Sequence, residues 1–338
     1  MVIGLIGILV LVLLLPFTVH RIERNLELFL FLMGCAAAYI SGVLQPPLIT
    51  KALQDPLHIT FAVIAAGIVF RWVRGPFESA VLYWSRLLPF RLFLACIIMI
   101  LGFISSIITA IIAALVLVAI ASVLQMDRRS EIRFVILACY AIGMGAVLTP
   151  IGEPLSTIAT SKLNEDFYYL MNLLGWDIVA GVFAFGLLAV FLIKPSRRST
   201  RDSSGQAAES YGGILVRGMK VYIFVLALTL LGAGFEPLIR LYLLDLHPLT
   251  LYWINMISAV LDNATLAAAE ISPAMDEATI QAILLGLLIS GGMLIPGNIP
   301  NIIAAGKLNI RSGEWARTGV PLGLFAMVVY FAILLARQ

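Results

Sequence analysis

Apolar segments alternate with short polar segments along almost the whole chain. Eight of the apolar segments have the length and low charge of membrane-spanning helices, which need about 20 residues to cross a hydrocarbon core of roughly 30 Å. They lie near residues 2–19, 26–44, 57–73, 132–163, 170–193, 214–234, 278–309 and 317–336. Two further apolar segments, 89–125 and 249–274, are too long for one span and contain small or polar residues near the middle, so we expect re-entrant hairpins. The pattern predicts an all-α polytopic membrane protein.

Composition supports a membrane protein and excludes a nucleic-acid-binding one. Of the 338 residues, 61% are hydrophobic and 12% are charged, whereas soluble domains carry about 25% charged residues. The net charge of +3 provides no basic surface for nucleic acid. Cys35, Cys96 and Cys139 lie inside apolar segments without a paired spacing, so we expect neither a disulfide framework nor a cysteine metal site.

The distribution of Lys and Arg predicts the topology. Most of these residues lie in five short segments, 20–25, 71–91, 126–133, 194–201 and 311–317. With eight spans and hairpins that return to their own side, all five segments fall on one face, which the positive-inside rule makes cytoplasmic. We therefore expect both termini outside the plasma membrane of a prokaryote. Residues 194–213 are rich in Ser and Gly and form a flexible cytoplasmic linker in this interpretation.

The linker divides two similar halves. Residues 150–164 align without gaps with residues 295–309, as PIGEPLSTIATSKLN over IPGNIPNIIAAGKLN. The hairpins match more faintly, as ISSIITAIIAA at 104–114 and ISAVLDNATLAA at 257–268. We divide the chain into a two-helix extension (1–56), a first repeat (57–193), the linker (194–213) and a second repeat (214–338). Each repeat contains a span, a hairpin, a broken span and a span. Three full crossings reverse its orientation, so the topology predicts inverted repeats.

Two spans are interrupted at corresponding positions by helix-breaking residues, which are Pro150, Gly152 and Pro154 in the first repeat and Pro296, Gly297 and Pro300 in the second. Freed backbone groups in hydrocarbon cost several kcal/mol each, so such breaks persist only where protein or a water-filled cavity satisfies them. The ends of the half-helices then offer partial charges to an ion. Paired breaks of this kind indicate a secondary transporter with its site at the bilayer midplane.

Two acidic residues lie at these positions. Asp262 is flanked by apolar residues in the second hairpin, and an acid at the bilayer centre costs about 2.5 to 3.5 kcal/mol on insertion scales, which favours a functional role. The alternative is a shallow helix cap. Glu153 lies in the first break, where it is either an ion ligand or the N-cap of the following half-helix. We expect a monovalent cation at Asp262 and Glu153. The neutral candidate ligands are Asn263, Thr265, Ser258, Thr149, Ser156, Thr157, Ser105, Ser106, Thr109, Asn298 and Asn301.

A proton and a cation can compete for one buried carboxylate, and this competition alone yields exchange. The leading hypothesis is therefore alternating-access sodium/proton antiport, with no cofactor beyond the transported Na⁺ and H⁺. A sodium-coupled anion or carboxylate symporter and an ion channel remain as alternatives. We expect no enzyme, because His20, His58 and His247 all fall near span ends and neither HExxH nor GxSxG occurs. The expected partners are the lipid bilayer and small inorganic ions.

Two motifs carry a resemblance to a known superfamily. Residues 149–157, TPIGEPLST, resemble the first broken-helix loop of sodium/proton antiporters, and residues 258–263, SAVLDN, resemble the second-hairpin signature of that branch. Together they resemble the ion transporter superfamily, which also includes arsenite permeases, citrate transporters and divalent anion/sodium symporters. The resemblance points to a small, uncharacterised branch of cation transporters. It implies two inverted repeats meeting at a central site, sodium coupling and often a homodimer with a scaffold region.

The hairpin tips depart from the carboxylate symporters of that superfamily. Those symporters carry Ser-Asn-Thr at the tips, whereas this chain has Ser105-Ser106-Ile107 and Ser258-Ala259-Val260. This difference favours a cation over a dicarboxylate as the transported solute.

Overall fold

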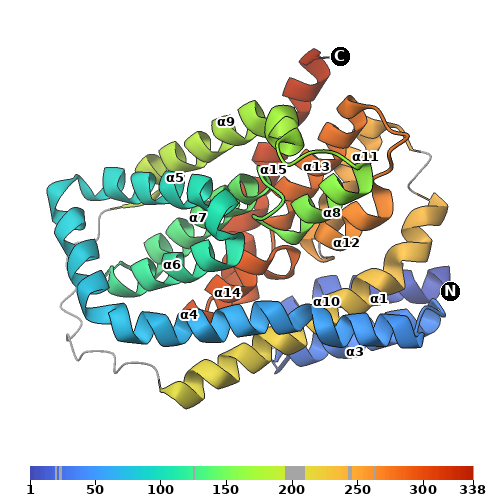
Figure 1. Cartoon of the computed structure of the whole chain (residues 1–338), viewed down its shortest axis with the longest axis horizontal. Coiled ribbons are helices and arrows are strands. Elements are labelled where there is room, and N and C mark those ends of the chain that lie inside the picture. Colours follow the sequence, from blue (N-terminus) through green and yellow to red (C-terminus); the bar gives the residue numbers. More distant parts are fainter. Residues whose placement is uncertain are drawn as a thin grey trace.

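The computed structural model describes residues 1–19, 21–22, 25–124, 126–194, 210–242, 246–261 and 263–337, and in these residues it contains helices and no strand. The helices fall into two layers (Figure 1). They are α1 (Val2–Thr18), α3 (Leu26–Ile40), α4 (Pro46–Leu87), α5 (Phe90–Ile108), α6 (Ala110–Val123), α7 (Arg128–Ala146), α8 (Pro154–Leu163), α9 (Tyr169–Leu192), α10 (Tyr211–Tyr242), α11 (Pro248–Ile254), η1 (Asn255–Ala259), α12 (Asn263–Glu270), α13 (Glu277–Gly291), η2 (Ile295–Gly297), α14 (Ile299–Leu308) and α15 (Ser312–Arg337).

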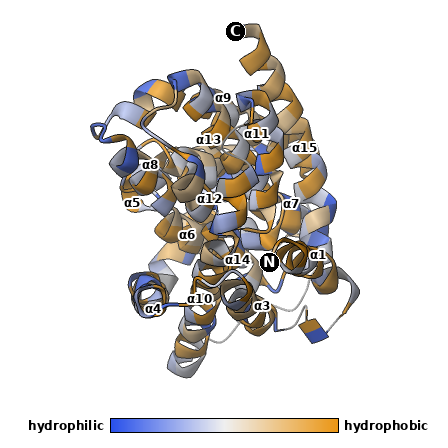
Figure 2. Cartoon of the chain, turned by 90° about the vertical axis from the view of Figure 1, so that its right-hand side faces the viewer, coloured by the Kyte–Doolittle hydropathy of each residue, from blue (hydrophilic) through white to orange (hydrophobic). Residues whose placement is uncertain are grey.

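Several helices have the length and hydropathy needed to cross a bilayer. In the described part of the chain, five do so by themselves: Pro46–Val69, Phe90–Ile108, Tyr169–Leu192, Tyr211–Ile239 and Ser312–Arg337. Shorter apolar helices cover Val2–Pro16, Leu26–Ile40, Ala110–Val123 and Glu277–Gly291. Large hydrophobic side chains such as Ile3, Trp176 and Phe191 are 77–87% exposed on the outside of the bundle, and Figure 2 shows hydrophobic residues along α1 and α15. Lipid is the solvent that makes such a surface stable.

One layer consists of α3, α4 and α10, which lie alongside one another in Figure 1. Two glycines allow α3 and α10 to approach closely. A Cβ at Gly34 would lie 2.7 Å from the Ala227 carbonyl oxygen, and a Cβ at Gly234 would lie 2.7 Å from the side chain of Ala37. Lipid provides no hydrophobic drive for helices to associate, so the close van der Waals packing that small residues allow stabilises such a crossing. We call α3, α4 and α10 the scaffold layer.

The scaffold helix α4 differs from the prediction at both ends. It begins at Pro46 rather than near residue 57, and it continues through 42 residues to Leu87. The segment around Asp55, Pro56 and His58 looked like a loop because it combines proline with polar residues. Pro46 occupies the first turn, where its missing N–H is tolerated, and Pro56 and Pro76 are accommodated inside the helix. Figure 1 shows α4 turning sharply in its last third.

Both expected hairpin segments fold as two arms joined at a break. Residues 89–125 form α5 and α6, with Thr109 between them at φ +75°. Residues 249–274 form α11, η1 and α12. The first arm, α5, has 19 residues and is long enough to cross a membrane, so it is longer than a re-entrant arm needs to be. Asp262, at the second break, lies outside the described residues.

Both expected broken spans are interrupted at the same points. The first consists of α7, which ends at Ala146, and α8, which begins at Pro154. The second consists of α13, which ends at Gly291, and α14, which begins at Ile299. Each second part has 10 residues and ends at an asparagine in the left-handed region, Asn164 (φ 54°) and Asn309 (φ 50°). Asparagine tolerates this conformation and provides a helix C-cap.

Each broken span also begins with an aspartate N-cap. Asp127 accepts a hydrogen bond from the Ser130 backbone N–H at 3.1 Å, and Asp276 accepts one from the Thr279 N–H at 3.3 Å. Hydrogen bonding from Thr279, first from its side chain, holds the pKa of the exposed Asp276 carboxyl below its ordinary value. These caps satisfy donors that a helix start leaves without partners.

Contacts between the halves are reciprocal. The second arm of the first hairpin, α6, packs against α14, and the second arm of the second hairpin, α12, packs against α8. In the same way α4 packs against α6, and α10 against α12. Each hairpin therefore lies between a scaffold helix and the broken span of the other half.

Described parts of the basic segments meet at one end of the bundle. Arg128 donates to the carbonyl oxygens of Leu308 (3.0 Å) and Asn309 (2.8 Å) and forms an ion pair with Glu314 at 2.8 Å. Arg133 of α7 donates to the Leu192 carbonyl oxygen at the end of α9 (2.7 Å). Arg71 of α4 lies over the Tyr211 ring at the start of α10, 4.3 Å from its centroid. Lys220 of α10 forms an ion pair with Glu27 at the start of α3 (2.9 Å). We call this the basic end. Most of the expected linker, residues 195–209, lies outside the described residues.

Candidate functional site

A cavity of 660 Å³ lies between the scaffold layer and the two breaks. We call it the central cavity. Its lining comes from α4 and α10 on one side and from both hairpins and both broken spans on the other. The expected site residues that line it are Thr109, Glu153, Thr157, Thr265 and Asn298, together with the break residues Gly152 and Pro154. Residues that are far apart in the sequence, and that belong to both halves, therefore share one cavity.

Four short helices begin at this cavity. Lining residues include Ala110, Pro154 and Ile299, the first residues of α6, α8 and α14, as well as Ala264 and Thr265 in the first turn of α12. A helix N-terminus carries roughly half a positive charge. Together the four ends favour a negative charge in the cavity, and the Glu153 carboxylate, which is only 6% exposed, lies among them.

The first break fixes the position of Glu153. Gly152 lies so close to the end of α7 that a Cβ there would overlap the Ala146 carbonyl oxygen. The Gly152 carbonyl oxygen accepts a hydrogen bond from the Ala110 N–H at 2.8 Å, which ties the break to the first hairpin. The Ser156 hydroxyl donates to the Glu153 carbonyl oxygen at 2.7 Å. Only glycine fits at position 152, so the close contact between the break and the end of α7 depends on this residue.

Other expected ligands in the first half bind backbone oxygens. The Ser105 hydroxyl donates to the Ile142 carbonyl at 3.0 Å. The Thr149 hydroxyl donates to the Ser106 carbonyl at 2.5 Å, and the Thr157 hydroxyl to the Pro150 carbonyl at 2.5 Å. The broken helix would leave such carbonyls without partners, so these hydroxyls stabilise the break and the hairpin tip.

The second half uses the same chemistry. The Ser258 hydroxyl, fully buried, donates to the Leu287 carbonyl at 3.1 Å and lies 2.6 Å from the Ser290 hydroxyl. The Asn301 amide donates to the carbonyls of Gly291 and Leu294, each at 2.9 Å, and so closes the second break. Like Ser105, Ser106, Thr149 and Ser156, the residues Ser258 and Asn301 are not among the residues that line the central cavity.

Asn298 brings the two broken spans together. It occupies the position before α14 that Glu153 occupies before α8, with φ/ψ of −153°/146° against −156°/163°. A Cβ at Gly143 of α7 would lie 2.7 Å from the Asn298 amide nitrogen. The N-cap of the second half-helix therefore packs directly on the first broken span while it also lines the cavity.

The second hairpin tip is described on both sides of Asp262. Asn263 is 3% exposed, and within the described residues its amide nitrogen has no hydrogen-bond partner. Thr265, two residues further along α12, lines the central cavity. Asp262 itself lies outside the described residues, so its expected role stays a prediction.

Sequence reasoning missed Glu270, the last residue of α12. It is fully buried, and the side chain of Asn255, which is also fully buried, lies within reach of its carboxylate. The signal was present, because Glu270 is a second acid within the apolar hairpin segment 249–274.

Four charged or titratable residues of the scaffold layer also line the central cavity: Lys51, Asp55, His58 and Glu236. Lys51, Asp55 and Glu236 lie outside the expected spans and His58 lies near the end of one, whereas the structure places all four on α4 and α10. Glu236 lies in the last third of α10, away from Arg217 and Lys220 near its start. With Glu153 the lining contains three acids, so the cavity combines carboxylates with hydroxyl and amide oxygens, the ligand set of hard cations. Across the described residues, no three His, Cys, Asp or Glu side chains cluster as metal ligands.

The helices, their apolar exterior and a polar cavity between paired breaks define a multi-pass, all-α membrane protein. A family model described as "Protein of unknown function (DUF1646)" matches residues 2–336. The chain belongs to this family. A comparison with curated proteins gave no match.

Proposed function

We propose that this protein is a secondary active transporter of small cations, and most specifically a sodium/proton antiporter. One observation carries the proposal: the two interrupted spans and the two hairpins meet at a single cavity in which the Glu153 carboxylate is 6% exposed. Interrupted helices are tolerated in a membrane where their ends line a cavity that binds an ion. In this proposal a proton and Na⁺ occupy the acidic site alternately, with Glu153 and Asp262 as the exchanging carboxylates.

The two halves are, in this proposal, inverted repeats. The ends of the broken helices support it, because Ala146, Pro154 and Asn164 correspond to Gly291, Ile299 and Asn309, each 145 positions further on. The hydrogen bonds agree as well. Ser105 donates to the carbonyl of Ile142, and Ser258 donates to that of Leu287, which again lies 145 positions after Ile142. Chance similarity in an apolar sequence does not explain equivalent caps, equivalent hydrogen bonds and reciprocal packing.

The apolar closure on one side of the cavity supports alternating access. Apolar residues of the scaffold layer and of α14, including Val63, Val221, Val225, Ile299 and Ile303, form a cluster on the side facing the basic end. The polar lining of α4 and α10 lies on the other side. By the positive-inside rule the basic end is cytoplasmic, both termini are outside a prokaryotic plasma membrane, and this conformation faces outward. Transport requires the apolar cluster to separate when the site turns inward.

A sodium-coupled anion symporter is the second candidate, and the four helix N-termini at the cavity favour it. Such ends bind anions readily, and Lys51 and His58 lie in the same lining. The resident carboxylates argue for the cation, since Glu153 already supplies negative charge where the helix ends favour it. The two candidates therefore differ in whether the charge at the N-termini belongs to the protein or to the solute.

Transport by purified protein in liposomes with an internal pH dye separates the candidates. Sodium, lithium, potassium or citrate is added outside in turn, with and without an imposed pH gradient. Antiport predicts proton flux in response to sodium or lithium and no proton flux in response to citrate. Anion uptake that occurs only with sodium present, without a response to cations alone, would replace the proposal with the symporter.

A further inference from the structure

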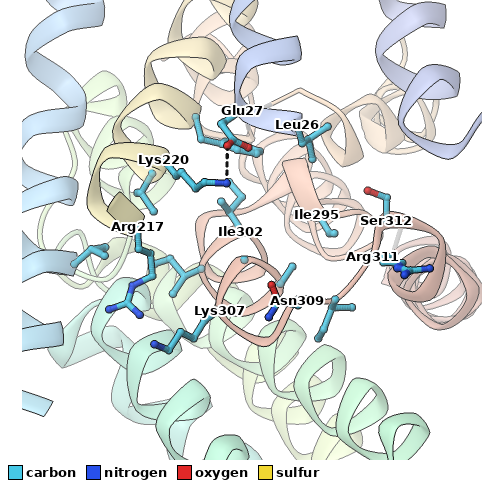
Figure 3. Close-up of a pocket in the computed structure, with 17 residues that line it drawn as sticks. Leu26, Glu27, Arg217, Lys220, Ile295, Ile302, Lys307, Asn309, Arg311 and Ser312 are labelled. Carbon is cyan, nitrogen blue, oxygen red and sulfur yellow. Dashed lines mark ion pairs between the residues drawn. The ribbon is translucent and has the colours of Figure 1, made fainter. Parts of the chain in front are cut away.

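A second cavity, of 490 Å³, lies at the basic end of the bundle (Figure 3). We call it the basic cavity. Its lining comes from the start of α3, the start of α10, the end of α14 and the connection to α15. Four basic side chains and one acidic side chain line it: Arg217, Lys220, Lys307, Arg311 and Glu27. Lys220 forms an ion pair with Glu27 at 2.9 Å, the dashed line in Figure 3, so positive charge remains in excess in the lining.

The backbone around the basic cavity adds to this excess. Leu26 and Ser312, the first residues of α3 and α15, both line it, and helix N-termini carry partial positive charge. The C-terminus of α14 carries partial negative charge. This charge is reduced, because the carbonyl oxygens of Leu308 and Asn309 accept hydrogen bonds from Arg128. Side chains and backbone therefore favour the same sign of ligand charge.

The deeper wall of the basic cavity is apolar. It includes Val63, Val221, Phe224, Ile302 and Ile303. Three of these residues, Val63, Val221 and Ile303, belong to the apolar cluster described above. Two further members of that cluster, Val225 and Ile299, line the central cavity. The cluster lies between the two cavities, so a ligand of the basic cavity is separated from the proposed transport site.

We propose that the basic cavity binds an anion that carries a phosphate group. Arg217 and Lys307 come from facing helices, α10 and α14, and Figure 3 shows their charged groups on the same side of the cavity. A guanidinium binds phosphate oxygens bidentately, and an ammonium adds a point charge. The apolar wall suits a ligand with a hydrocarbon part, as a phospholipid headgroup has, whereas inorganic phosphate would use the cations alone. Basic pockets between helices on the cytoplasmic side bind anionic lipid headgroups in other membrane proteins. This site is separate from the proposed transport function.

The test uses full-length protein in a neutral detergent, titrated with short-chain phosphatidylglycerol, short-chain phosphatidylcholine or inorganic phosphate, with binding followed by calorimetry and by the apparent Tm. The double variant Arg217→Gln/Lys307→Gln removes two charges from the lining. Arg129→Gln is the matched control, because Arg129 is an exposed basic residue at the same end that does not line the cavity. Loss of a charge-assisted contact weakens binding by roughly tenfold or more.

The proposal predicts saturable binding of phosphatidylglycerol, inorganic phosphate or both, weakened by roughly tenfold or more in the double variant and unchanged in Arg129→Gln. Binding of phosphatidylglycerol alone identifies a lipid, and binding of inorganic phosphate identifies a soluble anion. If the double variant does not elute as a folded protein, each single variant takes its place, and the charge-preserving Arg217→Lys retains binding. Equal binding of phosphatidylcholine, no binding of either phosphate compound, or wild-type binding by the charge-neutral variants would overturn the proposal.

Discussion

Replacing Glu153 with glutamine removes the one described carboxylate that lies within the first break and lines the central cavity. The shape of the side chain is kept, and the Ser156 hydroxyl still donates to the backbone carbonyl of residue 153 (2.7 Å). What is lost is a charge that is 6% exposed at the start of α8. An interaction with a charged group contributes about 1.5 to 3 kcal/mol. At about 1.4 kcal/mol per factor of ten, half-saturation by sodium should require a roughly ten- to hundredfold higher concentration.

The assay is sodium-dependent proton flux in liposomes at a series of sodium concentrations. Glu165→Gln is the matched control, because Glu165 is an exposed carboxylate just beyond the end of the same helix. Its loss removes the same charge without touching the cavity, so its sodium dependence should stay at the wild-type value. A Glu153→Gln protein with wild-type half-saturation and rate would refute the role assigned to the first break.

Three further predictions test other parts of the account. Asp262→Asn should abolish proton-coupled flux while Lys307→Ala retains much of it, and an active Asp262→Asn protein would contradict the exchange mechanism. Gly145→Ala should lower the free energy of unfolding by about 1 to 3 kcal/mol, because the added methyl group overlaps a carbonyl oxygen of α5. A wild-type melting temperature would show that the contact between α5 and α7 is looser than described. Arg337→Gln should lower the free energy of unfolding by about 1 kcal/mol, because it removes the 2.8 Å ion pair to Asp177, which is 4% exposed. The measurement is a lower Tm with transport intact, and an unchanged Tm would contradict a stabilising ion pair.

The helical architecture was readable from the sequence because lipid imposes strong rules. A chain that cannot leave backbone groups without partners in hydrocarbon must form helices, so apolar length alone located most of them. The breaks could also be located from the sequence, because helix-breaking residues in the middle of an apolar segment conflict with this requirement. Gly152 and Gly297 permit close backbone contacts that other residues do not, since a Cβ at Gly297 would lie 2.5 Å from the Gly291 carbonyl oxygen.

Side-chain roles were harder to predict than helix positions. Serine and threonine at a break can bind an ion or a freed carbonyl, and the sequence does not distinguish the two. Ser105 and Ser258 bind carbonyl oxygens of the neighbouring broken spans, whereas Thr109 and Thr265 line the central cavity. This division depends on which face of a short helix points at the cavity. Only the packing of one half against the other determines that face.

Tertiary contacts also changed the assignment of charged residues near helix ends. A lysine at the end of a membrane helix commonly extends to the membrane surface, and Lys162 is near the end of α8. Its ammonium instead donates to the carbonyl oxygens of Ala268 and, at 3.1 Å, Ile271, at the end of α12. These acceptors lie more than 100 positions away in the sequence, and local pattern carries no information about them. The contact ties the first broken span to the second hairpin.

Proton release on sodium binding tests the central claim most directly. The purified protein is placed in weakly buffered detergent solution with a pH dye, and sodium chloride is added against a choline chloride control. Competition between a proton and sodium for the carboxylates predicts a saturable release of protons in response to sodium and not to choline. Glu153→Gln or Asp262→Asn should abolish this release. Sodium binding with no release of protons would contradict competition between proton and cation for the carboxylates, and with it the antiport mechanism.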